Sequence, residues 1–498
     1  MSAIPISRIP RFYADRFGDS AALIQDDDLV SWEALDRRST RLAWGLRERG
    51  VGQDHLVLVA LPNSNAFYEI TFAIWKAGAI PHIVSWRLPE PEFAAIVDLA
   101  RPKVIVTQSE TFNQAFGGLT PSELQTSRDA SLPEVVSRYW KAMSSGGSTG
   151  RPKIIVDHTP SEIDPAETAV LLPHGGSVLN PGPLYHNAPF LFMHSALFQG
   201  NTVVGMAKFD AEETLRLIER HKINWINMVP TMMSRIWRLP EAVRNRYDLS
   251  SLQAIWHMAA PMPPWLKKEW IGWLGPERIW ELYGGTEGTG RTVINGVEWL
   301  QHVGSVGRPV ADCEVRIVDE NGVQLPRDTI GEIYFVPTSD EPPYHYIGAE
   351  SRRGADGAES LGDFGWLSDD GYLYLADRRV DLIISGGSNI YPAEVEGALM
   401  EHPGVEVAVV IGLPHEDLGA SVHAIVRPRQ DWSAPLDAEV LAAHVRERLA
   451  LYKTPRSYEF TEDELRDDAG KVRRTKLRDD RIARLSAATG DRIDRPAS

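Results

Sequence analysis

The chain has 498 residues, a single cysteine (Cys313), and 52 basic against 68 acidic residues, which gives a net charge of −16 with histidine neutral. One cysteine can neither close an internal disulfide nor supply a cysteine-rich zinc site, so we expect a reducing compartment, the cytoplasm. The acidic balance argues against a general nucleic-acid-binding protein, because phosphate binding needs a basic face. The most apolar segment, residues 66–84, is interrupted by Glu69, Lys76 and Pro81, so we expect no membrane span.

The first hundred residues alternate between helical and strand patterns. Ser31 precedes leucines at helical spacing, which predicts a helix to Glu48, and residues 55–61 are typical of a buried strand. The alternation continues with a helix, a strand, a helix and a strand at residues 66–76, 79–84, 91–99 and 103–107. Alternation at this pace predicts βαβ units around a largely parallel sheet. Residues 108–138 are polar and predict a long surface loop or a poorly ordered connector.

The later part of the chain changes its pattern twice. Residues 215–237 predict a helix, a strand and a further helix, whereas residues 313–337 alternate with period two around an Asn-Gly turn, which is typical of antiparallel strands. After residue 380, two helical segments alternate with two strands, at residues 392–402, 407–413, 421–429 and 437–450. This last part predicts a compact α+β unit of a little over a hundred residues.

Residues 143–153, with the sequence MSSGGSTGRPK, form a candidate phosphate-binding loop. Glycines allow backbone N–H groups to approach phosphate oxygens, hydroxyl groups add donors, and lysine adds positive charge. The spacing does not fit the Walker A motif, and a flexible Ser/Gly loop is the alternative interpretation. The candidate phosphate ligands are Ser144, Ser145, Gly146, Gly147, Ser148, Thr149, Gly150 and Lys153.

This layout resembles the Ser/Thr/Gly-rich loop of the adenylate-forming superfamily, which includes acyl-CoA synthetases, non-ribosomal adenylation domains and firefly luciferase. Five further motifs follow in the order of that family, at residues 183–187 (PLYHN), 283–287 (YGGTE), 362–366 (GDFGW), 377–396 and 452–474. Six motifs in one order over most of the chain are not expected by chance. The pattern is most similar to that of acyl- or aryl-CoA ligases.

The resemblance implies an α/β fold with a large amino-terminal adenylation domain at residues 1–377, which contains βα sheets and a small β-barrel-like region. A hinge at residues 378–382 and a small, mobile α+β carboxy-terminal domain at 383–498 would follow, with the ligands bound between the domains. Val380 stands at the hinge position, where the family usually has Asp or Lys. Because valine is stiff at χ1 and lacks polar contacts, this substitution predicts altered domain alternation.

The resemblance also implies the reaction. ATP and a carboxylic acid would form an acyl-adenylate with release of pyrophosphate, and CoA would then accept the acyl group. Both reactants of the first step are anions, so catalysis depends on charge neutralisation and alignment. Lys471 matches the catalytic lysine of the family, and Glu287 is the expected Mg2+ ligand. Thr286 would bind the α-phosphate, and His186 would stand between the acyl pocket and the thiol entrance.

The remaining site residues are also assigned by resemblance. Tyr283 and Gly284 would contact adenine, Asp363 the ribose hydroxyls, and Arg378 the nucleotide, with the adjacent Arg379 left open. The thiol tunnel would pass Gly386 and Gly387. The acyl pocket would be lined by Phe190, Trp225, Met228, Val229, Met232, Met258, Ala259 and Gly285. Because this lining is apolar, we expect an apolar acid, with aromatic and polycyclic acids among the candidates.

Some positions depart from the pattern of the family. The phosphate loop has Gly-Gly-Ser-Thr at residues 146–149, Ile154 follows Lys153 where glycine is usual, and residues 467–469 read Asp-Asp-Ala. None of these departures removes a charged catalytic group. Two alternatives stay open, namely an amide ligase that transfers the acyl group to an amine and a nucleotide-binding protein without catalysis. We expect ATP, Mg2+ and CoA as cofactors, small-molecule partners, and a monomer or homodimer.

Overall fold

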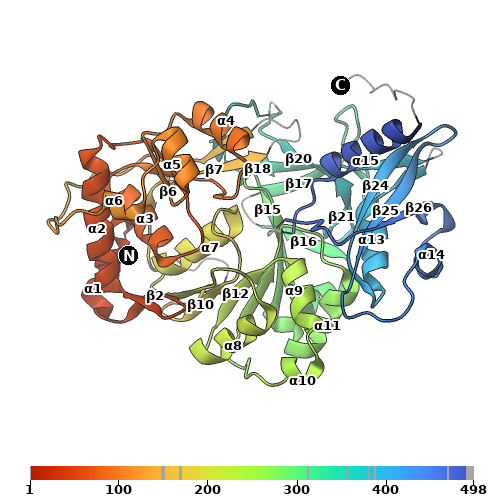
Figure 1. Cartoon of the computed structure of the whole chain (residues 1–498), viewed down its shortest axis with the longest axis horizontal. Coiled ribbons are helices and arrows are strands. Elements are labelled where there is room, and N and C mark those ends of the chain that lie inside the picture. Colours follow the sequence, from red (N-terminus) through yellow and green to blue (C-terminus); the bar gives the residue numbers. More distant parts are fainter. Residues whose placement is uncertain are drawn as a thin grey trace.

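The computed structural model describes residues 2–146, 152–167, 171–310, 313–339, 341–351, 353–354, 356–378, 381–385, 388–467 and 470–489. The predictions for Gly147, Ser148, Thr149, Gly150, Arg379, Val380, Gly386 and Gly387 lie outside these residues. A large α/β amino-terminal part and a smaller carboxy-terminal unit lie at opposite ends of the long axis (Figure 1). In the described part of the chain, no helix is both long and apolar enough to cross a membrane.

The first sheet confirms the predicted βα alternation. Helix α2 (Trp32–Glu48) begins where the hydroxyl of Ser31 accepts a hydrogen bond from the backbone N–H of Ala34. The sheet has the order β19-β8-β7-β5-β4-β6, and β7, β5, β4 and β6 are parallel. Its elements are β4 (Leu56–Ala60), α3 (Asn65–Lys76), β5 (Ile80–Ile83), α4 (Glu90–Ala100), β6 (Val104–Thr107), β7 (Lys141–Gly146), β8 (Pro152–Asp157) and β19 (Tyr344–Ile347).

A second sheet of 13 strands forms the centre of the molecule, in the order β17-β18-β20-β21-β16-β15-β14-β13-β12-β10-β11-β2-β3. The strands β2, β11, β10, β12, β13 and β14 are parallel, and helices α8, α9 and α11 lie along one side of this half (Figure 1). Its elements are β2 (Ala21–Gln25), β3 (Asp28–Ser31), β10 (Ser177–Asn180), α7 (Asn187–Phe198), β11 (Thr202–Gly205), α8 (Ala211–His221), β12 (Trp225–Met228), α9 (Pro230–Trp237), α10 (Glu241–Arg244), β13 (Ala254–His257), α11 (Pro264–Leu274) and β14 (Ile279–Gly284).

The antiparallel end of this second sheet is the region in which the sequence predicts a small barrel. Its strands continue the pairing of the parallel half from β14 onwards, so this region extends one sheet. Its elements are β15 (Arg291–Asn295), α12 (Gly296–Gln301), β16 (Ser305–Pro309), β17 (Cys313–Val318), β18 (Gly331–Pro337), β20 (Glu359–Leu367) and β21 (Leu373–Arg378). A two-stranded sheet, β1 (Ile4–Pro5) with β9 (Glu162–Ile163), and helix α1 (Ile9–Phe17) complete the amino-terminal part.

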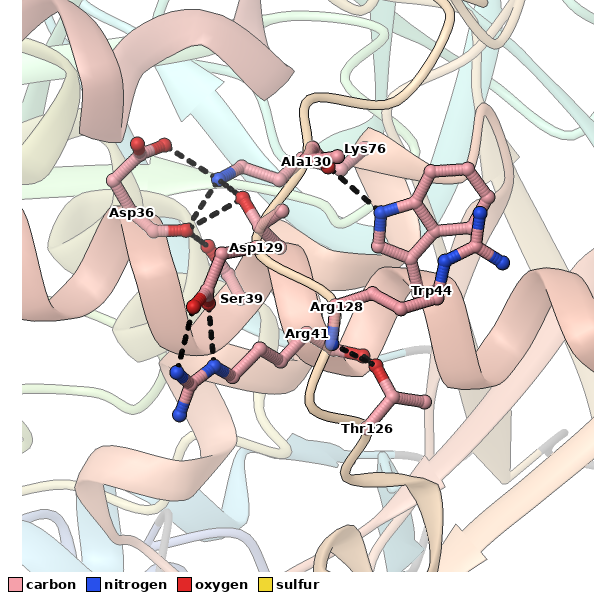
Figure 2. A network of polar contacts seen from close by, with 10 residues as sticks. Asp36, Ser39, Arg41, Trp44, Lys76, Thr126, Arg128, Asp129 and Ala130 are labelled. Atoms are coloured by element: carbon pink, nitrogen blue, oxygen red, sulfur yellow. Dashed lines mark hydrogen bonds and ion pairs between the residues drawn. The ribbon is translucent and has the colours of Figure 1, made fainter.

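The prediction of a surface loop for residues 108–138 is confirmed for residues 125–138, but it was wrong for the first half of the segment. That half contains two short helices, α5 (Glu110–Phe116) and α6 (Pro121–Leu124). The segment after α6 is held against α2, as Figure 2 shows: Arg41 donates to the carboxylate of Asp129 at 2.5 and 2.8 Å, and the indole N–H of Trp44 donates to the carbonyl of Ala130 at 2.7 Å. The polar composition of the segment did not indicate these contacts, because they are made with side chains of α2 that are far away in the sequence.

The carboxy-terminal unit is α+β, as predicted. Its sheet has the order β23-β22-β25-β24, with β26 paired to β25, and it encloses a hydrophobic core of its own. Its elements are β22 (Ile383–Ser385), β23 (Ser388–Ile390), α13 (Pro392–Glu401), β24 (Val405–His415), β25 (Gly419–Pro428), α14 (Ala438–Arg446), β26 (Ser457–Phe460) and α15 (Arg474–Thr489). The proposed boundary at residue 377 and the hinge at 378–382 stay predictions.

Candidate active site

A cavity of about 2970 Å³ lies between the amino-terminal part and the carboxy-terminal unit. Its walls include the carboxyl ends of three neighbouring parallel strands, at Met228 at the end of β12, Met258 directly after β13 and Tyr283 near the end of β14. Ligands of open α/β sheets bind at such strand ends, because the loops that follow the strands diverge there. The carboxy-terminal unit contributes residues 466–467 and 470–476 to the wall, which brings Lys471 to the same cavity.

The expected nucleotide residues lie together on adjacent walls of the cavity. The hydroxyl of Tyr283 donates to the Oδ2 atom of Asp363 at 2.7 Å, which links β14 to β20. Asp363 also stands opposite Arg378 in the register of β20 and β21, although only the backbone of Arg378 is described. At Gly285 a Cβ atom would lie 2.7 Å from the side chain of Leu361, so the chain leaves β14 through a turn that has no room for a side chain. Thr286 lines the cavity just beyond it.

Glu287 and Lys153, which are 134 positions apart in the sequence, form an ion pair at 3.2 Å. The hydroxyl of Tyr346, on β19, donates to the same carboxylate oxygen at 2.7 Å, and Lys153 also donates to that hydroxyl at 2.7 Å. Burial raises the pKa of Glu287, but the charge of Lys153 and the hydrogen bond from Tyr346 outweigh it and lower the pKa overall. Tyr346 lies outside every motif, so the sequence pattern did not predict its place in this site.

The donor set fits Mg2+ that arrives with ATP. Mg2+ at nucleotide sites is commonly bound by one or two carboxylates together with phosphate oxygens and water. Glu287 offers one ionised carboxylate, and its side chain is 13% exposed at the cavity. Within the described residues, no group of three His, Cys, Asp or Glu side chains could hold a metal by itself. Glu287 would therefore hold a metal ion whose other ligands are phosphates.

Ser144, at the beginning of the phosphate loop, contacts a buried histidine. The Oγ atom of Ser144, near the end of β7, lies 2.8 Å from the Nε2 atom of His82 on β5. Burial lowers the pKa of His82 to about 3, so its ring is neutral at physiological pH. Only the backbone of Ser145 and Gly146 is described, as the last residues of β7. His82 belongs to no motif, so nothing in the sequence pattern indicated this contact.

The loop of Lys471 contacts the amino-terminal part directly. A Cβ atom on Gly470 would lie 3.2 Å from the hydroxyl of Thr231 on α9, and Gly470 has a φ of +73°. The turn is closed by Asp467, whose carboxylate accepts the backbone N–H of Lys471 at 2.9 Å and whose own N–H donates to the carbonyl of Lys471 at 2.9 Å. Asp467 belongs to the stretch that departs from the family pattern. It serves here to shape the turn.

Most of the expected acyl-pocket residues line the cavity, but two do not. Met228, Val229, Met232, Met258, Ala259 and Gly285 are on its wall. Phe190 is instead fully buried in the core, with its ring 4.1 Å from that of His194 and 5.8 Å from that of Trp140. Trp225 is fully buried beside Phe192.

Helix and strand geometry explains this correction. Four of the α7 residues that line the cavity recur at the spacing of one helix face, and Phe190 belongs to the opposite face. These four are Ala188, Leu191, Phe192 and Ser195, and Asn187, Pro189 and Phe198 line the cavity near the two ends of the helix. Trp225 begins β12, whereas the cavity lies at the other end of that strand. The resemblance that predicted Phe190 and Trp225 as pocket residues does not show which helix face or which strand end meets the cavity.

The start of α7 combines a candidate catalytic histidine with a buried ion pair. His186 immediately precedes the helix and lines the cavity, with its ring 4.6 Å from that of Tyr185. The next residue, Asn187, accepts a hydrogen bond from the ammonium group of Lys141 at 2.9 Å. Lys141 is 2% exposed and also pairs with Asp157 at 2.7 Å, across β7 and β8. Lys141 was missed because a single lysine before the phosphate loop carries no recognisable pattern.

Comparison with known proteins identifies the family. Residues 11–139 and 142–336 match the family model of AMP-binding enzymes, and residues 394–471 match that of the AMP-binding enzyme C-terminal domain. The chain belongs to the AMP-binding enzyme family. A feruloyl-CoA synthase from Amycolatopsis sp is 33% identical to it over 468 residues, which cover 90% of this chain and 93% of the relative. The predicted superfamily and the enzyme class, an AMP-forming acid–thiol ligase, are thereby confirmed.

Solved structures confirm the predicted fold. The o-succinylbenzoate CoA synthetase from Bacillus subtilis, in complex with its acyl-adenylate intermediate, superposes with a TM-score of 0.81 at 25% identity, over 96% of this chain and 98% of that one. The same enzyme is also known in complex with ATP and a magnesium ion, the nucleotide and metal that the sequence predicts here. The amide bond synthetase McbA from Marinactinospora thermotolerans shares the fold, with a TM-score of 0.79 at 24% identity over 95% of this chain and 99% of that one.

Proposed function

We propose that this protein activates an apolar aromatic carboxylic acid with ATP and transfers the acyl group to CoA. The observation that carries this proposal is the single cavity onto which Lys471, Glu287 and Asp363 converge beside a wall of apolar side chains. The carboxyl group of the acid must meet first the α-phosphate of ATP and then the thiol of CoA, and a cleft between two domains allows this.

In the first step, a carboxylate oxygen of the acid attacks the α-phosphorus of ATP, and the bond from that phosphorus to the pyrophosphate oxygen breaks. Lys471 would neutralise charge on both reacting groups. A cation about 4 Å from each charge is worth about 4 kcal/mol per pair at an effective dielectric near 20. Mg2+, when bound at Glu287, supplies charge neutralisation on the phosphate oxygens and on the leaving pyrophosphate.

The other polar residues orient the reactants. Asp363 would accept the ribose hydroxyls and is held in place by Tyr283. Thr286 would donate to the α-phosphate, and Lys153 would offer its positive charge to the phosphates from the end of the phosphate loop. In the second step, the thiol sulfur of CoA attacks the acyl carbonyl carbon, and the bond from that carbon to the AMP oxygen breaks. His186 would stand where the thiol enters.

The lining of the acyl pocket supports an aromatic substrate. Met228, Met232 and Met258 offer adaptable apolar surface, which suits a flat ring. The same wall includes Ser195 and Asn187, so a ring that carries an oxygen substituent also finds hydrogen-bonding groups. Relatives named for feruloyl and o-succinylbenzoyl groups, both substituted aromatic acyl groups, support the same class.

Transfer to an amine is a second candidate function, which the resemblance to the amide bond synthetase and the uncharged residue at Val380 favour. In that reaction an amine nitrogen attacks the acyl carbonyl in place of the thiol sulfur, and AMP leaves as before.

We also propose a cytoplasmic location and a monomer or homodimer. The chain has one cysteine, Cys313, which is buried and cannot close an internal disulfide, and this supports a reducing compartment.

The test uses purified protein with ATP, Mg2+ and a panel of hydroxycinnamic, benzoic, fatty and polycyclic acids. Each acid is incubated with CoA, with a simple amine, and with neither, and the products are identified by mass spectrometry. We expect acyl-CoA and AMP, with the aromatic acids as best substrates. Amide without thioester would move the protein to the amide-forming class. ATP bound without AMP formation on every acid would overturn the proposal.

A further inference from the structure

Behind the Lys471 loop lies a buried network of charges that the catalytic assignment does not use. Its centre is Glu396 on α13, which is 3% exposed. One carboxylate oxygen, Oε2, accepts a hydrogen bond from Arg466 at 3.0 Å. The other, Oε1, accepts from Arg474 and from the backbone N–H of Val410, the latter at 2.9 Å. A single carboxylate thus joins two arginines and the middle of strand β24.

The two arginines flank Lys471 in the sequence and hold both ends of its loop. Arg466 donates a second hydrogen bond to the carbonyl oxygen of Gly470 at 3.1 Å, directly before the lysine. Arg474, three residues after the lysine, also pairs with Asp381 at 3.1 Å and donates to the carbonyl of Val410 at 3.3 Å. Asp381 belongs to the segment expected to act as the hinge. The network therefore joins the hinge end and the lysine loop into one body.

The electrostatics make Glu396 the critical member of this network. Burial lowers the pKa of Arg466, and the adjacent charge of Arg474 lowers it further, whereas Glu396 raises it. Without the carboxylate, two buried guanidinium groups would face each other with no shared counter-charge, which is strongly unfavourable. The arginines would then separate, and the carbonyl of Gly470 would move with Arg466.

We propose that Glu396 is a positioning residue for Lys471, which holds the lysine loop against α9 so that the ammonium group reaches the acid and the α-phosphate. This inference rests on the proposed function, in which Lys471 acts in adenylation and not in the transfer to CoA. It follows that loss of Glu396 impairs the two half-reactions unequally. A carboxylate that merely stabilised the carboxy-terminal unit would affect both steps alike.

The experiment measures the two half-reactions separately in Glu396→Gln. Adenylation is followed as acid-dependent exchange of pyrophosphate into ATP, and transfer is followed as acyl-CoA formation from synthetic acyl-adenylate. We expect adenylation to fall by about 100-fold, the loss that a displacement of a catalytic group by about 1 Å can cause. Transfer from the synthetic adenylate should match that of the wild type. Equal losses in both steps, or no loss in either, would overturn the proposal.

Glu459→Gln is the matched control, because Glu459 on β26 also pairs with an arginine, Arg481, at 2.7 and 3.0 Å in the same unit. It does not line the cavity, so both half-reactions should be unchanged. If Glu396→Gln does not yield folded protein, Arg474→Lys retains the positive charge but loses the planar fork, and the same selective loss of adenylation is expected.

A double variant decides whether Glu396 acts through the lysine. In the Lys471→Ala background, Glu396→Gln should cause no further loss of adenylation, because the group that it positions is already gone. A further loss of tenfold or more there would show an independent role and would overturn the proposal. Wild-type exchange is measured first: if it is absent for every acid, the proposed function fails, whereas wild-type exchange with an unaffected Glu396→Gln variant refutes this inference alone.

Discussion

The two walls of the candidate active site are held in place by different forces. The amino-terminal wall consists of strand ends, such as Tyr283 and Asp363, which the backbone hydrogen bonds of a 13-stranded sheet fix in position. The opposite wall is the turn of Lys471, which is held by ion pairs between side chains and touches the amino-terminal part at α9. A wall built into a sheet is rigid, whereas a turn clamped to its own small domain can move with that domain.

This difference predicts how variants on each side should fail. Changes on the amino-terminal wall disturb the packing of a large core, so they should cost stability or nucleotide affinity. Changes at the carboxy-terminal turn leave the main core intact, so they should cost one chemical step and little stability. The four predictions below test this contrast, from the largest expected effect to the smallest.

Lys471→Ala should lower the rate of adenylation by about three decades, since about 4 kcal/mol of transition-state stabilisation is lost at about 1.4 kcal/mol per decade. Transfer of the acyl group from synthetic acyl-adenylate to CoA should continue, and the melting temperature should not change. Pyrophosphate exchange, thioester formation and calorimetry measure the three quantities. Unchanged exchange would remove Lys471 from the mechanism.

Lys141→Met should destabilise the protein by about 3 kcal/mol, because Asp157 would keep its charge in a largely buried place without its partner. Burial raises the pKa of Asp157, but the charge of Lys141 together with the hydrogen bonds from Lys141 and Thr159 outweighs burial and keeps this pKa below its ordinary 3.8. The pair therefore stabilises the fold above about pH 4, and this contribution is lost as the pH falls below that value.

Denaturant titrations of Lys141→Met and the wild type at pH 7 and at about pH 3 measure this loss, because the lower pH lies below the ordinary pKa of Asp157. Lys222→Met is the control, because Lys222 pairs with Asp248 in an exposed position and should leave the midpoint unchanged. Equal midpoints for Lys141→Met and the wild type at pH 7 would contradict a structural role for the buried pair.

His82→Gln should make stability less dependent on pH. The pKa of His82 is lowered to about 3 by burial, so the unfolded chain binds a proton below pH 6.5 that the folded chain does not. Stability is therefore complete above pH 6.5 and falls by about 2 kcal/mol for this group between pH 6.5 and 5. Unfolding curves at both pH values should show a smaller difference for His82→Gln than for the wild type or for His55→Gln, which alters an exposed histidine.

Tyr283→Phe should have the smallest effect. It removes only the hydrogen bond to Asp363, which is worth about 1.5 kcal/mol when the acceptor is charged. We expect the KM for ATP to rise about tenfold, with the KM for the acid unchanged. Initial rates at varied ATP and varied acid separate the two constants. A rise in the KM for the acid instead would place Tyr283 in the acyl pocket.

The sequence by itself determined the family, the order of the helices and strands, and the motifs that supply Lys471, Glu287 and Asp363. It could do so because helices and strands follow local periodicity, and because motif residues keep their order along the chain. Helix α2, for example, begins at the serine that the pattern marks as its cap.

Only the tertiary structure decided which side chains meet. Glu287 contacts Lys153 on β8 and Tyr346 on β19. Ser144 on β7 contacts His82 on β5, and Glu396 binds both arginines that flank Lys471. The tertiary structure also places Phe190 and Trp225 in the hydrophobic core, although neighbouring residues of the same elements line the cavity. The physical reason is the same in each case: such contacts depend on strand order and on the faces of helices, and local sequence patterns do not encode the distance between residues that are far apart in the chain.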